Sequence, residues 1–519
     1  MAIEPGSVDL SAALVLEPTP LADWNIVAPV MIPIVIGAVL LMIRHETRFH
    51  AGLAIAALLG TLFCNIGLLA RVLDNGPLTM TMGRWLPPFG ISFTADALGA
   101  SMALAATLAA LVCALYSVSD IDNPRRRYGF YGFLMLMMAG VNGAFITGDI
   151  FNLYVWFEVF LISSFGLLIL GSERPQLDGA TKYAILNLLG TTLFLTATAM
   201  LYGAVGTLNM ADIARKMPQL QAAIPAGTLA TLFLFAFAMK AAAFPVNFWL
   251  PASYHTPRIA TAALFGGVLT KIGIYALLRT FGMLMPDQLG LLSTTIAWIA
   301  AATMIIGIMG ALAQTDLRRI LGFVVISGVG VMMAGLSLGT VEGFTGAIFY
   351  AFHSILVMTA LYLLAGVMNG LGGSYSLRSL SGLYASNPLI AVFAFLLLLA
   401  ASGLPPASGL WPKVILIRAA IDSGSPWLAF SILLTGLLTM LVLGRVFLLT
   451  VWRPRVEPTE NTIIASPMLG YSALLLLSLP VLLMGVYPDP FIEVASQAAN
   501  TLKNPSSYIG SVFPEAALR

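Results

Sequence analysis

Fourteen apolar segments, each long enough to cross a lipid bilayer, set the tightest limit on how this chain can fold. A membrane-spanning helix needs about 20 residues. The segments are residues 24–44, 51–72, 95–119, 128–147, 149–171, 178–205, 226–255, 258–283, 289–313, 317–337, 342–368, 386–422, 426–452 and 466–487. Of the 519 residues, 59% are hydrophobic and 9% are charged, whereas soluble proteins carry about 25% charged residues. The sequence therefore predicts an all-α integral membrane protein with about fourteen transmembrane helices.

The sparse charges and cysteines exclude several other classes of protein. A net charge of +2 without a basic tail gives no reason to expect a nucleic-acid partner. The two cysteines, Cys64 and Cys113, lie in separate apolar segments and lack the spacing of metal ligands. The sequence also contains no Walker-type glycine loop, no CxxC or HExxH motif and no paired histidines suited to haem. We expect no metal site, no catalytic site and no bound cofactor.

The positive charges divide unevenly between the two sides of the predicted membrane. One side collects Arg44, Arg48, Arg125, Arg126, Arg127, Arg174, Arg318, Arg319, Arg378, Arg453 and Arg455. The opposite side holds only Arg71, Arg84, Arg215, Lys216, Arg279 and Lys503. Because arginine-rich loops stay in the cytoplasm, this pattern places both termini on the outer, periplasmic side of a bacterial inner membrane.

Prolines interrupt two of the predicted helices within the membrane. The segment 226–255 contains Pro245 and Pro251, and the segment 386–422 contains Pro405, Pro406 and Pro412. Proline removes a backbone donor and clashes with the preceding turn, so helices 7 and 12 are predicted to break there. Two broken helices five spans apart suggest two inverted five-helix repeats around a transport path.

The repeats divide the chain into four predicted regions. These are peripheral helices with an external hairpin (1–127), a first repeat (128–283), a second repeat (289–452), and a last helix with a C-terminal tail (453–519). Residues 80–96 predict the hairpin, and Asp149 is predicted to cap the helix that follows it.

Buried charges are the chemical signal of this sequence. Four of the six lysines lie within or at the edge of apolar stretches, namely Lys182, Lys240, Lys271 and Lys413, and Glu158 is placed in the same way. A charge at the middle of a bilayer costs about 2.5–3.5 kcal/mol even on the mildest scale. A sequence that carries this cost several times is typical of a protein that moves charge.

Each of these residues also has a purely structural interpretation. Lys240 can bond carbonyl groups freed by the helix break, Lys271 can clamp two helices, and Lys182 can extend its amine to the membrane surface. His353, in the middle of a span, fits a satisfied core histidine as well as a proton relay. His255 lies in a loop beside the first broken helix, where it can admit protons from the inner side.

Glu158 and Lys240 form the most informative combination of charges. Burial disfavours the charged form of a lysine, and a nearby carboxylate favours it. At about 6 Å and an effective dielectric constant of 20, such a pair is worth about 3 kcal/mol. Making or breaking the pair can therefore drive proton uptake and release.

Five motifs resemble one family of membrane proteins. They are ITGDIFNLYVWFEVFLISSFGLL, LDGATKYAILNLLGTTLFL, MKAAAFPVNFWLPASYHTP, TDLRRILGF and GLPPASGLWPKVILI. In this order they resemble the antiporter-like membrane subunits shared by Mrp-type (Pha-type) cation/proton antiporters and the proton-pumping arm of NADH–quinone oxidoreductase. The likeness runs over roughly residues 90–450 and is strongest to the D-type subunits of the Mrp antiporters.

The resemblance assigns roles to the buried charges. It implies that Glu158 and Lys240 form the acid–lysine pair of the family and that Lys271 is the central relay. Lys413 would face the outer exit, and Lys182 would modulate the pair. Relatives often carry a lysine five residues after the histidine in the eleventh helix, where this chain has Met358. This departure weakens a role for His353 within a polar pair.

The resemblance also implies partners and a function. We expect a hetero-oligomer with a large A-type subunit and small membrane subunits, with lipids between them, that exchanges Na⁺ or K⁺ for H⁺. One rival function is a redox-driven proton-pump subunit of a quinone oxidoreductase or membrane hydrogenase. Another is a structural subunit that has kept the fold while a partner transports.

Overall fold

Helices make up almost the whole chain. The computed structural model describes residues 14–15, 18–220, 222–454 and 467–513. The helices of the first half are α1 (Trp24–Met42), α2 (Thr47–Asn75), α3 (Ala97–Asp120), α4 (Asn123–Arg127), α5 (Phe130–Ile146), α6 (Ile150–Ile169), α7 (Arg174–Val205), α8 (Met210–Leu220), α9 (Ala226–Ala241), α10 (Trp249–Ser253), α11 (Ile259–Leu264) and α12 (Thr270–Arg279).

The second half continues the same helical bundle. Its helices are α13 (Pro286–Ala313), α14 (Leu317–Leu338), α15 (Val341–Gly372), α16 (Leu383–Ser386), α17 (Pro388–Ser402), α18 (Leu410–Asp422), α19 (Pro426–Phe447), α20 (Pro467–Val486), α21 (Asp489–Lys503) and α22 (Ser506–Val512). Three π-helical turns, at Phe265–Leu269, Thr280–Leu284 and Leu448–Trp452, extend α11, α12 and α19.

The predicted membrane architecture is confirmed. Within the described ranges, eleven helices are long and apolar enough to cross a membrane, and three shorter apolar helices, α5, α9 and α17, lie beside them. Each uninterrupted apolar segment coincides with one of these helices. The two interrupted segments coincide with α9 and α10 and with α17 and α18. The chain is an all-α, multi-pass membrane protein.

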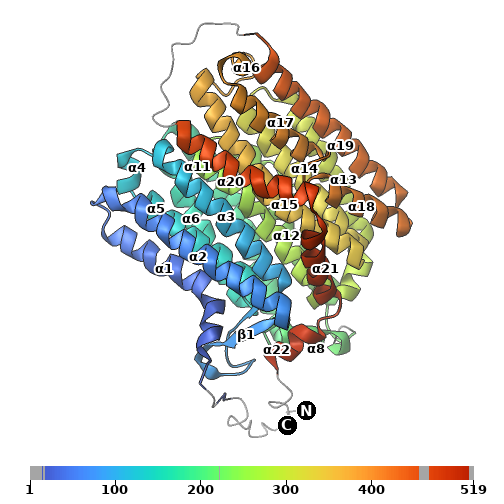
Figure 1. The fold of residues 1–519 in the computed structure, drawn as a ribbon. Helices are drawn as coiled ribbons and strands as arrows, with labels where there is room; N and C mark the ends of the chain where they lie inside the picture. Colours follow the sequence, from blue (N-terminus) through green and yellow to red (C-terminus); the bar gives the residue numbers. More distant parts are fainter. Residues whose placement is uncertain (1–13, 16–17, 221, 455–466, 514–519) are drawn as a thin grey trace, which may run out of the picture.

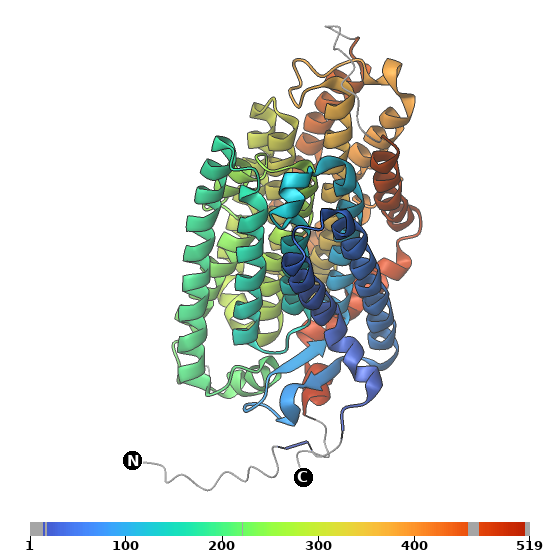
Figure 2. The ribbon, with the colours of Figure 1, turned by 90° about the vertical axis from the view of Figure 1, so that its left-hand side faces the viewer.

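The bundle has two distinct ends (Figure 1). One end, which we call the hairpin end, carries the β-hairpin, α8 and α22 (Figures 1 and 2). The opposite end carries α4 and α16, and we call it the arginine end because α4 contains Arg125, Arg126 and Arg127.

The helices at the centre of the bundle are buried along their length. The most apolar stretches of the α11–α12 unit and of α15 contain only buried residues, and α14 is nearly as enclosed. In α1, α2 and α19, by contrast, less than half of the corresponding stretch is buried. The central helices therefore pack on protein from all sides, while the outer helices turn one side to lipid or to a partner.

Helices 7 and 12 break as predicted. The first break separates α9 from α10 and begins at Ala242, which adopts the left-handed φ of +60°. The second separates α17 from α18 and begins at Gly403, with a φ of +82°. Pro245, Pro405 and Pro406 lie within the breaks.

Two of the predicted helix-breaking prolines have a different position. Pro251 and Pro412 lie in the first turns of α10 and α18, just past the breaks. A first-turn N–H has no partner inside its helix, so proline costs no hydrogen bond there. These two prolines start the second half-helices and do not interrupt the first ones.

The hairpin and the helix cap follow the sequence predictions. Strands β1 (Leu78–Thr81) and β2 (Ser92–Ala95) pair antiparallel, with Leu78 opposite Ala95. Asp149 caps α6, because its carboxylate accepts a hydrogen bond from the Asn152 backbone N–H at 2.7 Å. Both features lie at the hairpin end, next to the start of α3 and the end of α5.

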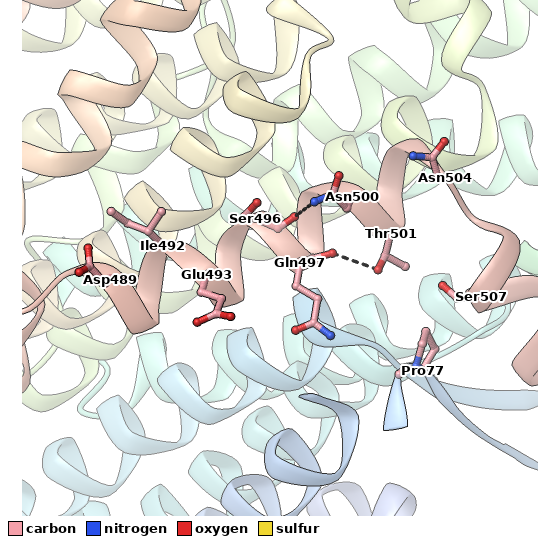
Figure 3. A pocket seen from close by; sticks show the side chains of 11 residues that line it. Pro77, Asp489, Ile492, Glu493, Ser496, Gln497, Asn500, Thr501, Asn504 and Ser507 are labelled. Carbon is pink, nitrogen blue, oxygen red and sulfur yellow. Dashed lines mark hydrogen bonds between the residues drawn. The ribbon is translucent and has the colours of Figure 1, made fainter. Parts of the chain in front are cut away.

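The described part of the expected C-terminal tail is helical instead. Helix α21 packs on α15 and α3, and α22 packs on α8 and on both strands. The alanines and Leu502 of α21 face the bundle, while its polar side faces an open groove of about 870 Å³ (Figure 3). In this groove Asn500 and Thr501 bond back to carbonyls of their own helix. The tail was missed because alternating small and polar residues carry no strong apolar signal.

Close backbone packing holds the first break against the centre of the bundle. A Cβ added to Gly273 of α12 would lie 2.6 Å from the backbone nitrogen of Ala241, the last residue of α9. Gly60, in the middle of α2, has no atom within 4 Å of the same position.

We expect Gly273→Ala to destabilise the protein although alanine favours helices. Overpacking of this kind typically costs about 1–3 kcal/mol, which exceeds the gain of about 0.5–1 kcal/mol from replacing a helical glycine. The thermal unfolding midpoint in detergent, followed by tryptophan fluorescence, should fall for Gly273→Ala and not for Gly60→Ala. Equal midpoints for the two variants would contradict the packing argument.

Candidate functional site

Four of the residues predicted to act in transport lie inside the bundle, each beside an irregular stretch of helix. Lys240, Lys271, His353 and Lys413 are between 0% and 8% exposed. Lys240 ends α9 at the first break, Lys271 follows a π-helical turn, and Lys413 starts α18 after the second break. Broken or widened turns release backbone groups from the regular hydrogen-bond pattern, so they supply polar partners at a depth where water is scarce.

Among the described residues, the Lys240 amine finds no hydrogen-bond partner. Its Nζ is fully buried and lies 5.7 Å from the centre of the Phe157 ring. The stem of the side chain passes Gly190 of α7, where an added Cβ would lie 3.6 Å from Cε. The interpretation that Lys240 bonds carbonyls freed by the break is therefore wrong.

Glu158 approaches Lys240 without touching it. The carboxylate, on α6, acts electrostatically on the amine. Among the described residues, however, no ion pair within 4 Å joins the two. Glu158 is half-buried, whereas Phe157 beside it is fully buried. In this structure Glu158 and Lys240 therefore form no direct ion pair.

Lys271 bonds to its own helix. Its Nζ donates a hydrogen bond of 2.8 Å to the carbonyl of Gly266, in the π-helical turn that precedes it. The turn lies directly against α15, because a Cβ at Gly266 or Gly267 would come within 2.5 Å of Tyr362 or 2.0 Å of Thr359. The interpretation of Lys271 as a clamp between helices is not supported, since its bond stays within one helical unit.

Lys413 closes the second break. Its Nζ donates a hydrogen bond of 2.7 Å to the carbonyl of Ser402, the last residue of α17. A Cβ at Gly403 would lie 2.7 Å from this nitrogen, so the amine occupies the space that a side chain would fill. The role of bonding a freed carbonyl, considered for Lys240, belongs to Lys413.

His353 connects the centre of the bundle with the second break. Its Nδ1 forms a hydrogen bond of 2.8 Å with the hydroxyl of Ser408, between α17 and α18. The charges of both Lys413 and Lys271 act on the imidazole. The imidazole, on α15, is therefore within electrostatic reach of both amines.

A pocket of about 560 Å³ opens beside the first break toward the arginine end. His255 and Lys182 line it together with Asp178 and Arg319. His255 bonds the Pro251 carbonyl through Nδ1 at 2.9 Å and accepts from the Arg319 guanidinium through Nε2 at 3.1 Å. Burial, followed by the charges of Arg319 and Arg318, lowers the pKa of His255, which agrees with a neutral ring in this position.

Lys182 lies apart from the buried amines. Its side chain is 49% exposed and pairs with Asp178 at 2.6 Å. Gly190, beside Lys240, is eight residues further along α7, which corresponds to about 12 Å of helix. The structure therefore places Lys182 in the pocket and not in contact with the Glu158–Lys240 pair.

Comparison with known proteins identifies the family. A family model described as "NADH:quinone oxidoreductase/Mrp antiporter, TM" matches residues 147–439, which include Glu158 and all four buried residues of the site.

The chain belongs to this family.

Individual relatives agree with the family over nearly the whole chain. A D-type subunit of an Na⁺/H⁺ antiporter from Alkalihalophilus pseudofirmus is 37% identical over 492 residues, which are 94% of this chain and 99% of the relative. A chain in the structure of the Mrp complex from Dietzia sp. DQ12-45-1b superposes with a TM-score of 0.88 at 28% identity, covering 95% of this chain and 100% of that one. A chain of respiratory complex I from Thermus thermophilus gives a TM-score of 0.80 at 26% identity, covering 92% and 100%.

The antiporter-family resemblance read from the five motifs is confirmed, and the departure at Met358 can be placed. Met358 is buried on α15, next to the Thr359 side chain that meets the π-helical turn. At the place where the resemblance leads one to expect a lysine, the chain therefore has a buried thioether.

Sequence reasoning missed the most deeply buried ion pair of the described chain. Arg279 was counted among the charges of the outer side, yet it is 1% exposed and pairs with the fully buried Asp96 at 2.7 Å. The available signal was a pair of opposite charges in two apolar segments. Asp96 lies at the start of the segment 95–119, and Arg279 lies near the end of the segment 258–283. Nothing in a single sequence shows that residues 183 positions apart meet.

The described residues contain no group of three histidine, cysteine, aspartate or glutamate side chains that could hold a metal ion.

We expect Ser408→Ala to destabilise the protein by leaving His353 Nδ1 unpaired. Ser408 is fully buried, and a buried polar group without a partner costs about 1–3 kcal/mol. The thermal unfolding midpoint in detergent should fall, whereas Ser431→Ala, at a partly exposed position on α19, should leave it unchanged. If both variants unfold at the wild-type temperature, the His353–Ser408 bond does not hold the second break.

Proposed function

We propose that this chain translocates protons as one member of a multisubunit antiporter that exchanges Na⁺ or K⁺ for H⁺. The row Lys240, Lys271, His353 and Lys413 carries the proposal, because it joins the two helix breaks through the centre of the bundle. Buried, weakly partnered amines inside a membrane are costly and are found where charge moves. The relative from Alkalihalophilus pseudofirmus is a sodium/proton antiporter subunit, which agrees with this assignment.

The hydrogen bonds of the row allow each group to change its charge. A lysine amine can donate to the Gly266 or Ser402 carbonyl both as an ammonium and as a neutral amine. The Ser408 hydroxyl can act as donor or acceptor, so it serves His353 in either tautomer. At Lys271, His353 and Lys413, protons can therefore pass without leaving a buried polar group unpaired.

Glu158 and the pocket provide the entry side of the route. Protons enter from the arginine end past His255, with Lys182 and Asp178 at the mouth. An approach of Glu158 toward Lys240 favours the ammonium, and its withdrawal favours release toward Lys271. Repulsion between neighbouring cations then drives the proton past His353 to Lys413, which delivers it to the hairpin end.

The half-exposed Glu158 also supports a partner subunit. On the same face of α6, Phe151 is 40%, Val155 is 37% and Ile162 is 61% exposed. A carboxylate left facing lipid in the middle of the membrane is costly. We therefore place another antiporter subunit, of the large A-type or the small type, against this face, with lipids filling the remaining surface.

The orientation and domain division complete the proposal. The arginine end faces the cytoplasm of a bacterial cell, and the hairpin end and both termini face the outer side of its inner membrane. Residues 128–283 and 289–452 form two inverted repeats, flanked by the regions 1–127 and 453–519. This division is supported by the two breaks, which occur at corresponding places in the two halves.

A respiratory pump subunit is the second candidate. It is supported by the fold similarity to a chain of respiratory complex I at 26% identity. The 37% identity to a D-type antiporter subunit favours the antiporter. Purifying the native assembly separates the two: hydrophilic iron–sulfur subunits indicate the pump, and membrane subunits alone indicate the antiporter.

We expect Lys271→Ala to abolish most transport and Lys182→Ala to leave most of it. Loss of a proton-transfer group typically lowers the rate by about a hundredfold or more, whereas Lys182 is half-exposed and ion-paired at the pocket mouth. Sodium-dependent proton movement should be measured with a pH-sensitive dye in inside-out vesicles containing equal amounts of assembled complex. Equal rates for the two variants would remove Lys271 from the route.

We expect Glu158→Gln to slow the same sodium-dependent proton movement several-fold, because it removes the charge that acts on Lys240. The matched control is Glu173→Gln, which changes an exposed carboxylate paired with Arg125 at the arginine end. A normal rate in an assembled Glu158→Gln complex would instead favour a purely structural function, in which a partner carries out the transport.

A further inference from the structure

One face of α12 carries three polar residues that run from the proton row toward the hairpin end. Lys271, Tyr275 and Arg279 are spaced four residues apart, so they lie above one another on the same side of the helix. The Arg279 guanidinium donates a hydrogen bond of 3.2 Å to the Tyr275 hydroxyl. The proposed transport does not use this continuation of the row.

Arg279 is held rigidly and completely away from solvent. Two hydrogen bonds, of 2.7 and 2.8 Å, join its guanidinium to the two carboxylate oxygens of Asp96. The rings of Tyr275 and Tyr508 each lie with their centres 5.2 Å from the guanidinium carbon. Asp96, Tyr275 and Tyr508 are fully buried, and Arg279 is 1% exposed.

The same groups tie together the helix ends that meet at this depth. Asp96 also caps α3 by accepting from the Gly99 N–H at 2.9 Å. The Tyr275 hydroxyl donates to the carbonyl of Phe145, near the end of α5, at 2.8 Å. A Cβ at Gly99 would lie 2.2 Å from that carbonyl oxygen, so α3 and α5 touch backbone to backbone. Close backbone contact therefore lies beside the tyrosine hydroxyl at this depth.

The chemistry of Arg279 stops proton transfer. A guanidinium has five N–H donors, no acceptor, and does not lose its proton in proteins. The Tyr275 hydroxyl, one helical turn from Lys271, therefore meets a group that can neither accept a proton nor pass one on. The fixed positive charge in addition repels a hydronium ion or a second ammonium on this side of Lys271.

We infer that Arg279, held by Asp96, is the barrier that closes the first half of the molecule toward the hairpin end. It forces protons that reach Lys271 to move sideways to His353 and Lys413 and not directly outward. This inference rests on the proposed function, because it assigns a direction to the proton on Lys271. Asp96 is a positioning residue, and the barrier itself is the charge at residue 279.

The test compares passive proton leak, without sodium, in vesicles that contain the assembled complex. The informative variant is the double substitution Asp96→Asn/Arg279→Gln, which removes both charges and leaves two neutral amides that can still form hydrogen bonds. We expect it to leak protons several-fold faster than the wild type, while Arg279→Lys, which keeps a cation, should not. Arg445→Gln, at another helix end where a partly buried arginine donates to the Leu312 carbonyl, serves as the matched control.

A single substitution separates the barrier from a merely structural role. Asp96→Asn loosens the pair but leaves the positive charge, so we expect a lower thermal unfolding midpoint and no additional leak. A leak in Asp96→Asn or Arg279→Lys equal to that of the double variant would overturn the inference, as would an assembled double variant as tight as the wild type. If the wild-type complex itself shows no sodium-dependent proton movement, the proposed function fails first, and the two failures are thereby distinguished.

Discussion

A lipid bilayer offers no water to a backbone group that has lost its partner, and this constraint accounts for where the amines of this protein lie. The second break leaves the Ser402 carbonyl free, and the Lys413 amine binds it. The π-helical turn frees the Gly266 carbonyl, and the Lys271 amine binds that one. In each case an irregular helix and a buried cation compensate each other's cost. The irregular turn and the lysine amine that binds its carbonyl therefore form one unit, and either of them alone would be costly at this depth.

At Lys240 a helix break and a buried amine lie side by side but do not bond to each other. Lys240 lies at the first break, but its amine has no partner, and Glu158 stays out of contact. An unpaired buried amine is the least stable of the three, and it is therefore the one whose charge responds most to a moving carboxylate. In the proposed proton route, this difference in hydrogen bonding makes Lys240 the natural first member of the row.

The sequence predicts the membrane architecture well because the physics that specifies it is local. Apolar length fixes the spans, and Pro245 and the Pro405–Pro406 pair fix the breaks, since both effects act within a few residues. The places of Pro251 and Pro412 in first turns were harder to predict, because the sequence does not show whether a proline ends one helix or starts the next. The family motifs located the candidate residues. The partner of each amine could not be predicted, because it depends on the distance between helices. The Asp96–Arg279 pair was missed for the same reason.

Tyr508 belongs to α22, which follows the fourteenth span, and its ring completes the enclosure of Arg279. The enclosure of Arg279 is thus completed by α22, which leaves the ribosome after all of the membrane helices have been made. During biogenesis the bundle would pass through a stage in which all spans are inserted but this lining is still missing. A cell that depends on its proton gradient benefits when α22 docks promptly, and premature termination between α20 and α22 would yield a protein whose spans are all present but whose insulation is not.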